Sequence, residues 1–368
     1  MPLDRVLARL RQRITPTRRA AFLAGFIAGY LIHLFAFTNI IPNSDGLSRV
    51  FDPQQMTVSG RWFLHYASFL NDFTQMPALI GFFSMVFLAL AAAGVVTALN
   101  LHSRALSAFA GVLMAAFPCL GYTFLYMFTA SAYCLAILLA VLAVCLVKKG
   151  GWLRTLAGVV LLALAMGIYQ AYAAVAVALS LLVVLRACLH ARSTLKGTAR
   201  LGFRLAGFLA VGAALYYGIL QIFLAVKDLE LLDYLGMSDA GSGYPIAQLP
   251  GLILSAYKQV FVFFFWPNGS NSFTTPLLAG LDLLALALAV ACFLAIVFRR
   301  ALWREPWRLI GALVLAALLP LAVGFAQIIA PFSDATPIMK YAYVLVYMAV
   351  LLAADLGLSF LPRPRGGM

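Results

Sequence analysis

Apolar residues occur along this chain in repeated runs of about twenty, separated by short polar segments. A helix of that length is long enough to cross the ~30 Å hydrocarbon core of a bilayer. The runs at 155–168 and 171–186 are short, so 155–186 can alternatively be one long bent helix. The pattern predicts an all-α, polytopic membrane protein with about ten spans. We place these spans at 20–40, 77–99, 106–122, 125–147, 155–168, 171–186, 204–226, 277–298, 309–330 and 341–361.

The overall composition strengthens this prediction. The chain is 64% hydrophobic and 10% charged, with a mean hydropathy of +0.99. The apolar runs are longer than the strands of an outer-membrane barrel, which alternate in hydrophobicity over about ten residues. No segment is long and polar enough for a separate soluble domain, so we expect residues 1–368 to form a single membrane domain.

The distribution of charge predicts the topology. With a cytoplasmic N-terminus, 21 of the 26 lysines and arginines fall in cytoplasmic segments. By the positive-inside rule, both termini are then cytoplasmic, and 41–76 and 227–276 are long periplasmic loops. The net charge of +14 reflects this topology and is not evidence of nucleic-acid binding. The five outer basic residues are Arg49, Arg61, Lys227, Lys258 and Lys340.

The N-terminal segment 1–19 is basic and precedes the first span. Within it, 3–14 (LDRVLARLRQRI) places Arg5, Arg9 and Arg13 four residues apart, with apolar residues on another face. This spacing predicts a basic amphipathic helix on an anionic cytoplasmic leaflet. A plain topology signal is the compatible alternative. The first apolar run ends in FTNIIPNSD without a small-x-small cleavage site, which argues against a cleaved signal.

Both long outer loops contain apolar segments that we expect to lie on the membrane. In 250–266 a short apolar helix is interfacial or re-entrant. In 61–73 (RWFLHYASFLNDF) the large apolar side chains recur every three or four residues, which predicts an interfacial amphipathic helix. Those side chains are Trp62, Tyr66, Phe69, Leu70 and Phe73.

Polar and aromatic side chains also gather at the outer ends of the spans, whereas the inner ends carry mainly arginine and lysine. An aromatic belt explains many of the tyrosines. It does not explain Gln170, Gln221, Gln327 or Lys340, because polar groups near span ends usually face a cavity or the bundle interior. We therefore expect a polar cavity that opens outward, beside lipid.

The first outer loop contains the residues best suited to chemistry. Asp45 lies just after the first span, between Pro42 and Gly46, where the chain is expected to turn. A carboxylate at a cavity mouth can act as a general base towards a hydroxyl. Arg61 follows sixteen residues later, and its guanidinium suits a phosphate. Alternatively, Asp45 caps a helix and Arg61 pairs with Asp52 or Asp72.

Several stretches resemble the type II glucosyl transferase family, the serotype-converting O-antigen glucosyltransferases. The similarity extends over most of the chain, and SGRW together with GIYQAY is its most specific part. The stretches are NSD at 43–45, SGRW at 59–62, YMFTASAYCLAILLAVLAV at 126–144, MGIYQAYAAVAVALSLL at 166–182 and KYAYVLVYM at 340–348.

The resemblance implies a GT-C type membrane enzyme of the bacterial inner membrane. Such enzymes move a sugar, here glucose, from a polyprenyl-phosphate carrier to a glycan on the periplasmic side, with inversion. Asp45 then corresponds to the base and Arg61 to a contact with the donor phosphate. Family members often carry a second acid after the first, and Gly46 takes that place here. A flippase and a cytoplasmic lipid-sugar synthase are the implied functional partners.

Other residues are weaker candidates for binding the donor or acceptor. Lys340 can help to neutralise the phosphate, and the remaining candidates offer charge, hydrogen bonds or stacking surfaces. They are Arg49, Asp52, Tyr169, Gln170, Trp266 and Asn268.

We identify no definite cofactor. The five cysteines form no CxxC pair, and the four histidines show no metal-ligand spacing. Asp45 and Asp52 could share a divalent cation. The alternative functions are a lipid-linked sugar flippase or transporter and an O-antigen polymerase. A transporter would be expected to show inverted repeats and broken helices, and we find no convincing internal repeat.

Overall fold

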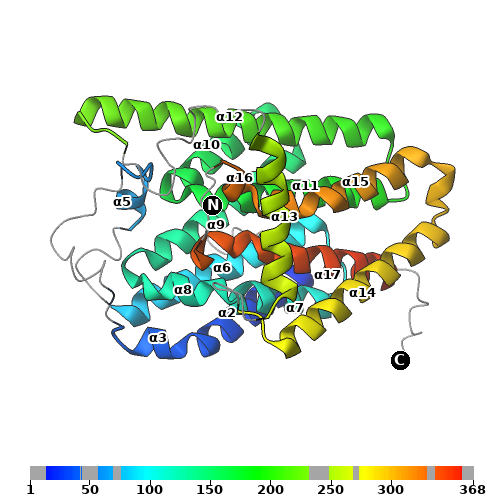
Figure 1. The fold of residues 1–368 in the computed structure, drawn as a ribbon, viewed down its shortest axis with the longest axis horizontal. Coiled ribbons are helices and arrows are strands. Elements are labelled where there is room, and N and C mark those ends of the chain that lie inside the picture. The colour runs from blue at the N-terminus through cyan, green and yellow to red at the C-terminus, as the bar shows by residue number, and fades with distance from the viewer. Residues whose placement is uncertain are drawn as a thin grey trace, which may run out of the picture.

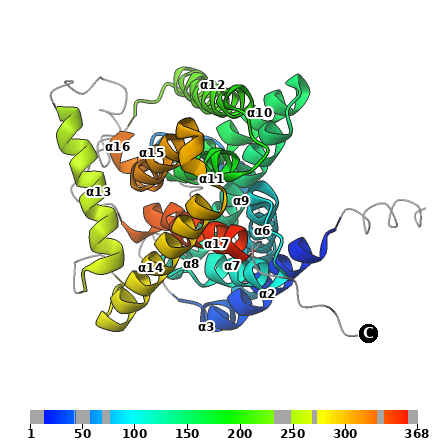
Figure 2. The same ribbon diagram turned by 90° about the vertical axis from the view of Figure 1, so that its right-hand side faces the viewer.

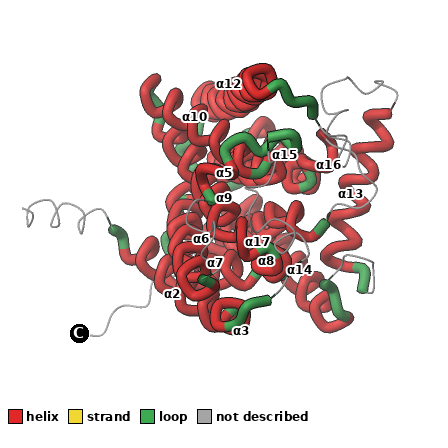
Figure 3. The backbone as a smooth tube through the Cα atoms, turned by 90° about the vertical axis from the view of Figure 1, so that its left-hand side faces the viewer, coloured by secondary structure: helices red, strands yellow, loops and turns green. Residues whose placement is uncertain are grey.

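The structure, a computed structural model, describes residues 14–41, 43, 57–68, 76–231, 248–267, 273–329 and 336–358. Its regular elements are all helices within these ranges, and the tube in Figure 3 contains no strand. The prediction of an all-α fold is confirmed. Of the basic segment 3–14, residues 3–13 lie outside the described residues.

The first half of the chain contributes helices that follow one another closely. In chain order they are α2 (Pro16–Ile32), α3 (Leu34–Thr38), α5 (Leu64–Ala67), α6 (Pro77–Leu99), α7 (Arg104–Ala116), α8 (Cys119–Leu125), α9 (Met127–Lys149), α10 (Trp152–Ile168), the 3-10 helix η1 (Gln170–Tyr172) and α11 (Ala173–Leu189).

The second half begins with the longest described helix. Its elements are α12 (Leu195–Lys227), α13 (Leu249–Phe265), α14 (Pro276–Arg299), η3 (Leu302–Arg304), α15 (Pro306–Val323), α16 (Phe325–Ile329), η4 (Pro337–Tyr343) and α17 (Val344–Leu358).

Of the described helices, seven are long and apolar enough to cross a membrane, or eight when α7 and α8 count as one span bent by 44°. The protein is therefore a membrane protein. The predicted spans at 20–40 and 155–168 correspond to α2 with α3 and to α10. Helices α2 and α10 have 17 residues each, which is about 25 Å at 1.5 Å per residue. The count of about ten spans and their orientation stay predictions.

The segment 155–186 forms two antiparallel helices and not one bent helix. Helix α10 begins just after Lys148, which donates to Ala98 O at 2.7 Å. Near the end of α11, Arg186 returns to the same place and donates to Asn100 O at 3.5 Å. The chain reverses between them through the short η1.

Helix α13 differs from the long helices in its direction. Figure 1 shows α12 and α17 along the long axis of the molecule, whereas α13 crosses that axis. Figure 2 shows α13 at one side of the bundle, where it contacts α14, α15 and α16. This direction favours an interfacial position for 250–266 over a crossing parallel to the other helices.

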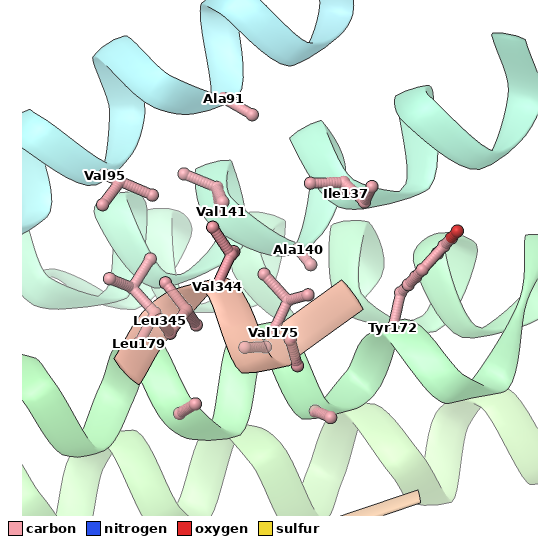
Figure 4. Packing of buried hydrophobic residues seen from close by; sticks show 14 of the residues in the cluster. Ala91, Val95, Ile137, Ala140, Val141, Tyr172, Val175, Leu179, Val344 and Leu345 are labelled. Carbon is pink, nitrogen blue, oxygen red and sulfur yellow. The ribbon is translucent and has the colours of Figure 1, made fainter. Parts of the chain in front are cut away.

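The core lies where α6, α9, α11 and α17 meet. Figure 4 shows its side chains, with Val95 from α6, Val141 from α9, Leu179 from α11 and Leu345 from α17. All four side chains are fully buried, with an exposed fraction of 0%. Small residues between them allow the helices to approach closely, as is usual in membrane bundles.

One end of the bundle, which we call the basic end, contains arginines and lysines that bind the carbonyls of helix C-termini. Arg308 is buried and donates to Cys188 O at 3.0 Å and His190 O at 2.9 Å, at the end of α11. Arg204 donates to Lys148 O at 3.0 Å, at the end of α9. These bonds satisfy carbonyls that have no partner within their own helix and place positive charge at the negative end of the helix dipole.

The opposite charge appears where a helix begins at the same end. Asp355 of α17 is buried and accepts from Ser103 N at 2.8 Å and His102 N at 3.0 Å, at the start of α7. A carboxylate suits the positive N-terminal end of a helix. Asp355, which falls within the predicted span 341–361, is therefore a cap for α7.

Helices α2 and α7 approach each other through glycines. A Cβ added at Gly111 would lie 3.0 Å from Gly25 N and even closer to Ala21 O. Both of these atoms belong to the backbone of α2, so one helix would have to move. The glycine thus permits the close approach of α2 and α7.

We expect Gly111→Ala to lower the free energy of unfolding by about 1–3 kcal/mol, because overpacking at a helix contact forces the backbones apart. The measurement is the thermal unfolding midpoint of the purified protein in detergent. Gly207→Ala is the matched control, because a Cβ at Gly207 meets nothing within 4 Å. Equal midpoints for the two variants would refute the role of Gly111.

Candidate functional site

The segment around Arg61 begins with a tight turn. Gly60 N donates to Thr57 O at 2.9 Å, and Gly60 has φ +77°. This left-handed conformation favours glycine over any residue with a Cβ. The glycine of the SGRW stretch is therefore required by the backbone.

Three hydrogen bonds hold the backbone on both sides of Arg61. Gln170 Nε2 donates to Ser59 O at 2.8 Å, and Tyr216 OH donates to Gly60 O at 2.9 Å. Phe63 N donates to Gly167 O at 2.8 Å. The partners come from η1, α12 and α10, so three separate elements bind this short segment.

The neighbouring Trp62 anchors the segment by burial. Its side chain is 5% exposed and stacks on Tyr216 and Phe223 of α12, with ring centroids 6.5 and 5.8 Å apart. The ring also covers Gly167, where an added Cβ would lie 2.7 Å from Trp62 Cε2. The absent side chain of Gly167 leaves room for the indole.

This position corrects the prediction of an interfacial helix over 61–73. Trp62 packs inside the bundle and not on a membrane-facing surface, and regular helix in the described part is limited to α5 (Leu64–Ala67). Figure 3, seen from the end that carries α5, places α5 close to α9, and the two helices are in contact. Residues 69–73 lie outside the described residues.

The Arg61 side chain lies against two tyrosines. Arg61 Nη1 donates to Tyr133 OH at 3.3 Å, and its Cζ lies 4.7 Å from the ring centroid of Tyr169. The two rings are stacked, with centroids 4.8 Å apart and an interplanar angle of 21°. Asp52 and Asp72, the carboxylates considered as partners of Arg61, lie outside the described residues.

These rings belong to a larger tyrosine cluster, which we define as Tyr133, Tyr169, Tyr172 and Tyr341. Tyr172 makes edge contacts with Tyr169 at 5.1 Å, Tyr133 at 6.0 Å and Tyr341 at 6.2 Å. All four side chains are buried. Lys340, the residue before Tyr341 in η4, is also buried, at 8% exposure. The cluster therefore extends from Arg61 to the position next to Lys340.

Four stretches far apart in the sequence meet at this cluster. SGRW provides Arg61, and the stretch at 126–144 provides Tyr133. The GIYQAY stretch provides Tyr169, Tyr172 and the Gln170 that binds Ser59. The stretch at 340–348 provides Tyr341 and Lys340. The described parts of the similar stretches thus form one site.

Two other predicted residues that the structure describes, Trp266 and Gln327, are not brought into this cluster. Trp266 follows the end of α13 and is 61% exposed. Gln327 pairs instead with Gln259 and Tyr343, the latter at 3.1 Å. The other candidates lie outside the described residues, namely Asp45, Arg49, Asp52 and Asn268.

A hollow of about 420 Å³ lies at the end of α12. Gln221, one of the outer polar residues from which we predicted an outward cavity, lies in its lining. The lining of this hollow also includes Leu224, Ala225, Asp228, Leu229, Glu230 and Leu231.

Within the described ranges, no three residues among histidine, cysteine, aspartate and glutamate come together as metal ligands.

Sequence reasoning assigned no role to several residues of this site, and two of them hold the backbone beside Arg61. Gly167 and Tyr216 received no role, although both bind the Arg61 segment. Gly167 is part of the MGIYQAY stretch, so its neighbours offered a signal. Tyr216 lies in the apolar run AALYYGIL, where an aromatic residue is unremarkable.

A model of the family described as glucosyl transferase GtrII matches residues 34–353. The chain therefore belongs to this family, and the predicted resemblance is confirmed. No curated protein and no solved structure matches the chain. Membership in the family makes the protein a membrane glycosyltransferase.

We expect Gln170→Ala to loosen the Arg61 segment, because it removes the donor to Ser59 O. Hydrogen exchange of peptides that cover 57–68 should become faster, including at the Phe63 amide. Gln221→Ala is the control, since this exposed glutamine on α12 does not contribute to the three bonds. Unchanged protection in Gln170→Ala would contradict the anchoring role.

Proposed function

We propose that this member of the GtrII family transfers glucose from polyprenyl phosphate to a cell-surface glycan such as O-antigen, with inversion, on the periplasmic side of a bacterial inner membrane. The observation that carries the proposal is the convergence of the family-like stretches on Arg61 and the tyrosine cluster. A cation among buried aromatic rings suits an anionic group presented near lipid.

The proposed reaction is a single displacement at the anomeric carbon. The Asp45 carboxylate takes the proton of an acceptor hydroxyl, and the oxygen attacks the anomeric carbon. The bond from that carbon to the phosphate oxygen breaks, and polyprenyl phosphate leaves. Inversion follows because the nucleophile enters opposite the leaving group. Asp45 is assigned by the family resemblance of the NSD stretch, and it lies outside the described residues.

The proposed role of Arg61 is to stabilise the charge that develops on the leaving phosphate. A fixed cation in a water-poor site stabilises such charge more strongly than a mobile one in water. Three bonds hold the backbone of the residues on both sides of Arg61, and Tyr133 and Tyr169 hold its guanidinium. Lys340, buried beside Tyr341, is the second proposed contact of the phosphate.

The lipid-linked donor must be made and delivered by other proteins. A cytoplasmic synthase would attach glucose to polyprenyl phosphate, and a flippase would move the product to the periplasmic leaflet. Arg49, Asp52, Trp266 and Asn268 stay candidates for contact with sugar or acceptor. A divalent cation shared by Asp45 and Asp52 stays a prediction.

We expect Asp45→Asn to reduce transfer at least a hundredfold, because general-base catalysis typically contributes 10²–10⁴-fold. Purified protein in liposomes would receive radiolabelled polyprenyl-phosphate glucose and a lipopolysaccharide acceptor from the same organism. The native chain should label the acceptor, and the variant should bind the donor without labelling it.

Asp72→Asn is the matched control, since Asp72 is another acid of the same outer loop and takes no part in the proposed reaction. Full transfer by Asp45→Asn would place the base elsewhere, with Asp52 examined next. Movement of the donor across the bilayer by the native chain, without transfer, would favour a flippase.

A further inference from the structure

We propose that Tyr133 and Tyr169 are positioning residues, which hold the Arg61 guanidinium in the orientation that receives the donor phosphate. The inference rests on the proposed function and extends it to two residues that do not themselves need to touch the substrate. Tyr169 was a candidate for substrate contact, and Tyr133 had no role. The proposal gives both a role that acts through Arg61.

Two contacts from different directions fix the planar guanidinium of Arg61. The face of the Tyr169 ring lies against the guanidinium, with 4.7 Å from Cζ to the ring centroid. Tyr133 OH accepts from Nη1 at 3.3 Å. The ring contact limits displacement from the guanidinium plane, and the hydrogen bond limits rotation within it. Together they define where the other N–H groups point.

The tyrosines can serve as a platform because they are themselves held. Their rings are stacked on each other, and Tyr172 packs against both with its edge contacts. The exposed fractions of Tyr133 and Tyr169 are 4% and 3%. Tyr133 lies on α9, one of the most buried helices, and Tyr169 is fixed between α10 and η1. Neither ring can turn away without displacing core residues.

Neither tyrosine carries a net charge that would compete with an anion for the guanidinium. A carboxylate at the same distance would neutralise the guanidinium and compete with a phosphate for it. A ring face and a hydroxyl attract the guanidinium while carrying no net charge. The two tyrosines thus orient Arg61 without neutralising it.

Four variants test the proposal by the affinity for polyprenyl phosphate and by the kcat/KM of transfer. Tyr169→Leu removes the ring and should lower both about thirtyfold, the loss expected for a desolvated cation–π contact. Tyr133→Phe removes the hydroxyl and should lower them severalfold. Tyr169→Phe keeps the ring face and should stay within twofold of the native chain. Arg61→Ala sets the loss expected when the positioned group itself is absent.

A double-mutant cycle separates positioning from packing. If Tyr169 acts through Arg61, then Tyr169→Leu should cause no further loss in the Arg61→Ala background. If Tyr169 only supports the fold, the two losses should multiply. Multiplicative losses, or a native-like Tyr169→Leu, would overturn the proposal.

Trp303→Leu controls for the removal of an aromatic ring. Trp303 pairs with Phe298 at 5.7 Å between centroids, near the basic end and away from the cluster. It should bind polyprenyl phosphate as the native chain does. Because binding is measured without sugar transfer, a native chain that binds but does not transfer would refute the proposed function alone. A native chain that does not bind polyprenyl phosphate would refute the positioning role as well.

Discussion

The candidate site depends on the three hydrogen bonds and one buried indole that hold residues 59–63 against the bundle. Ordering five residues costs about 1–2 kcal/mol each, or roughly 5–10 kcal/mol in total. Three hydrogen bonds return about 0.5–1.5 kcal/mol each. Burial of a tryptophan side chain adds about 4–6 kcal/mol, from 150–250 Å² at about 25 cal/mol per Å². The bonds alone are therefore insufficient, and Trp62 with its place over Gly167 makes the ordered segment possible.

The two ends of the bundle handle unpaired polar groups in different ways. At the basic end, arginine and lysine side chains bind the carbonyls where α6, α9 and α11 stop. At the α5 end, the carbonyls of Ser59 and Gly60 are bound by a glutamine and a tyrosine, and Arg61 lies on rings. Charge is thus used for capping at one end, while at the other end neutral donors support a cation.

Much of the fold could be predicted from the sequence, because helix length and apolarity follow directly from the bilayer. The positions of α6, α9 and α12 agree with the predicted spans to within several residues, apart from the start of α12, which extends nine residues before its span. Trp62 was misplaced because a three- or four-residue spacing looks the same for a side chain on lipid and for one inserted into a bundle. The capping role of Arg308 was not predictable, since it depends on α11 and α15 meeting across 120 residues.

The contacts of the candidate site could not be predicted from the sequence. The charge and outer position of Arg61 predict a phosphate ligand, which stays a prediction. Its partners come from α9 and the α10–η1 junction, which no local pattern relates to residue 61. These partners lie on the best-packed part of the described chain. In the most apolar stretch of each span, 72% of the residues are buried in α9 and also in η1 with α11, against 22% in α12 and 11% in α14. The proposed donor phosphate is linked to a lipid tail and must be reached from the bilayer, so the proposed site needs one rigid side and one side open to lipid. Tyr216 and Phe223, which hold the Arg61 segment, lie on α12, which is more exposed than α9 or α11. Arg61 is therefore held between the rigid helices and a helix that faces outward, which fits a donor whose tail stays in the membrane while its phosphate enters.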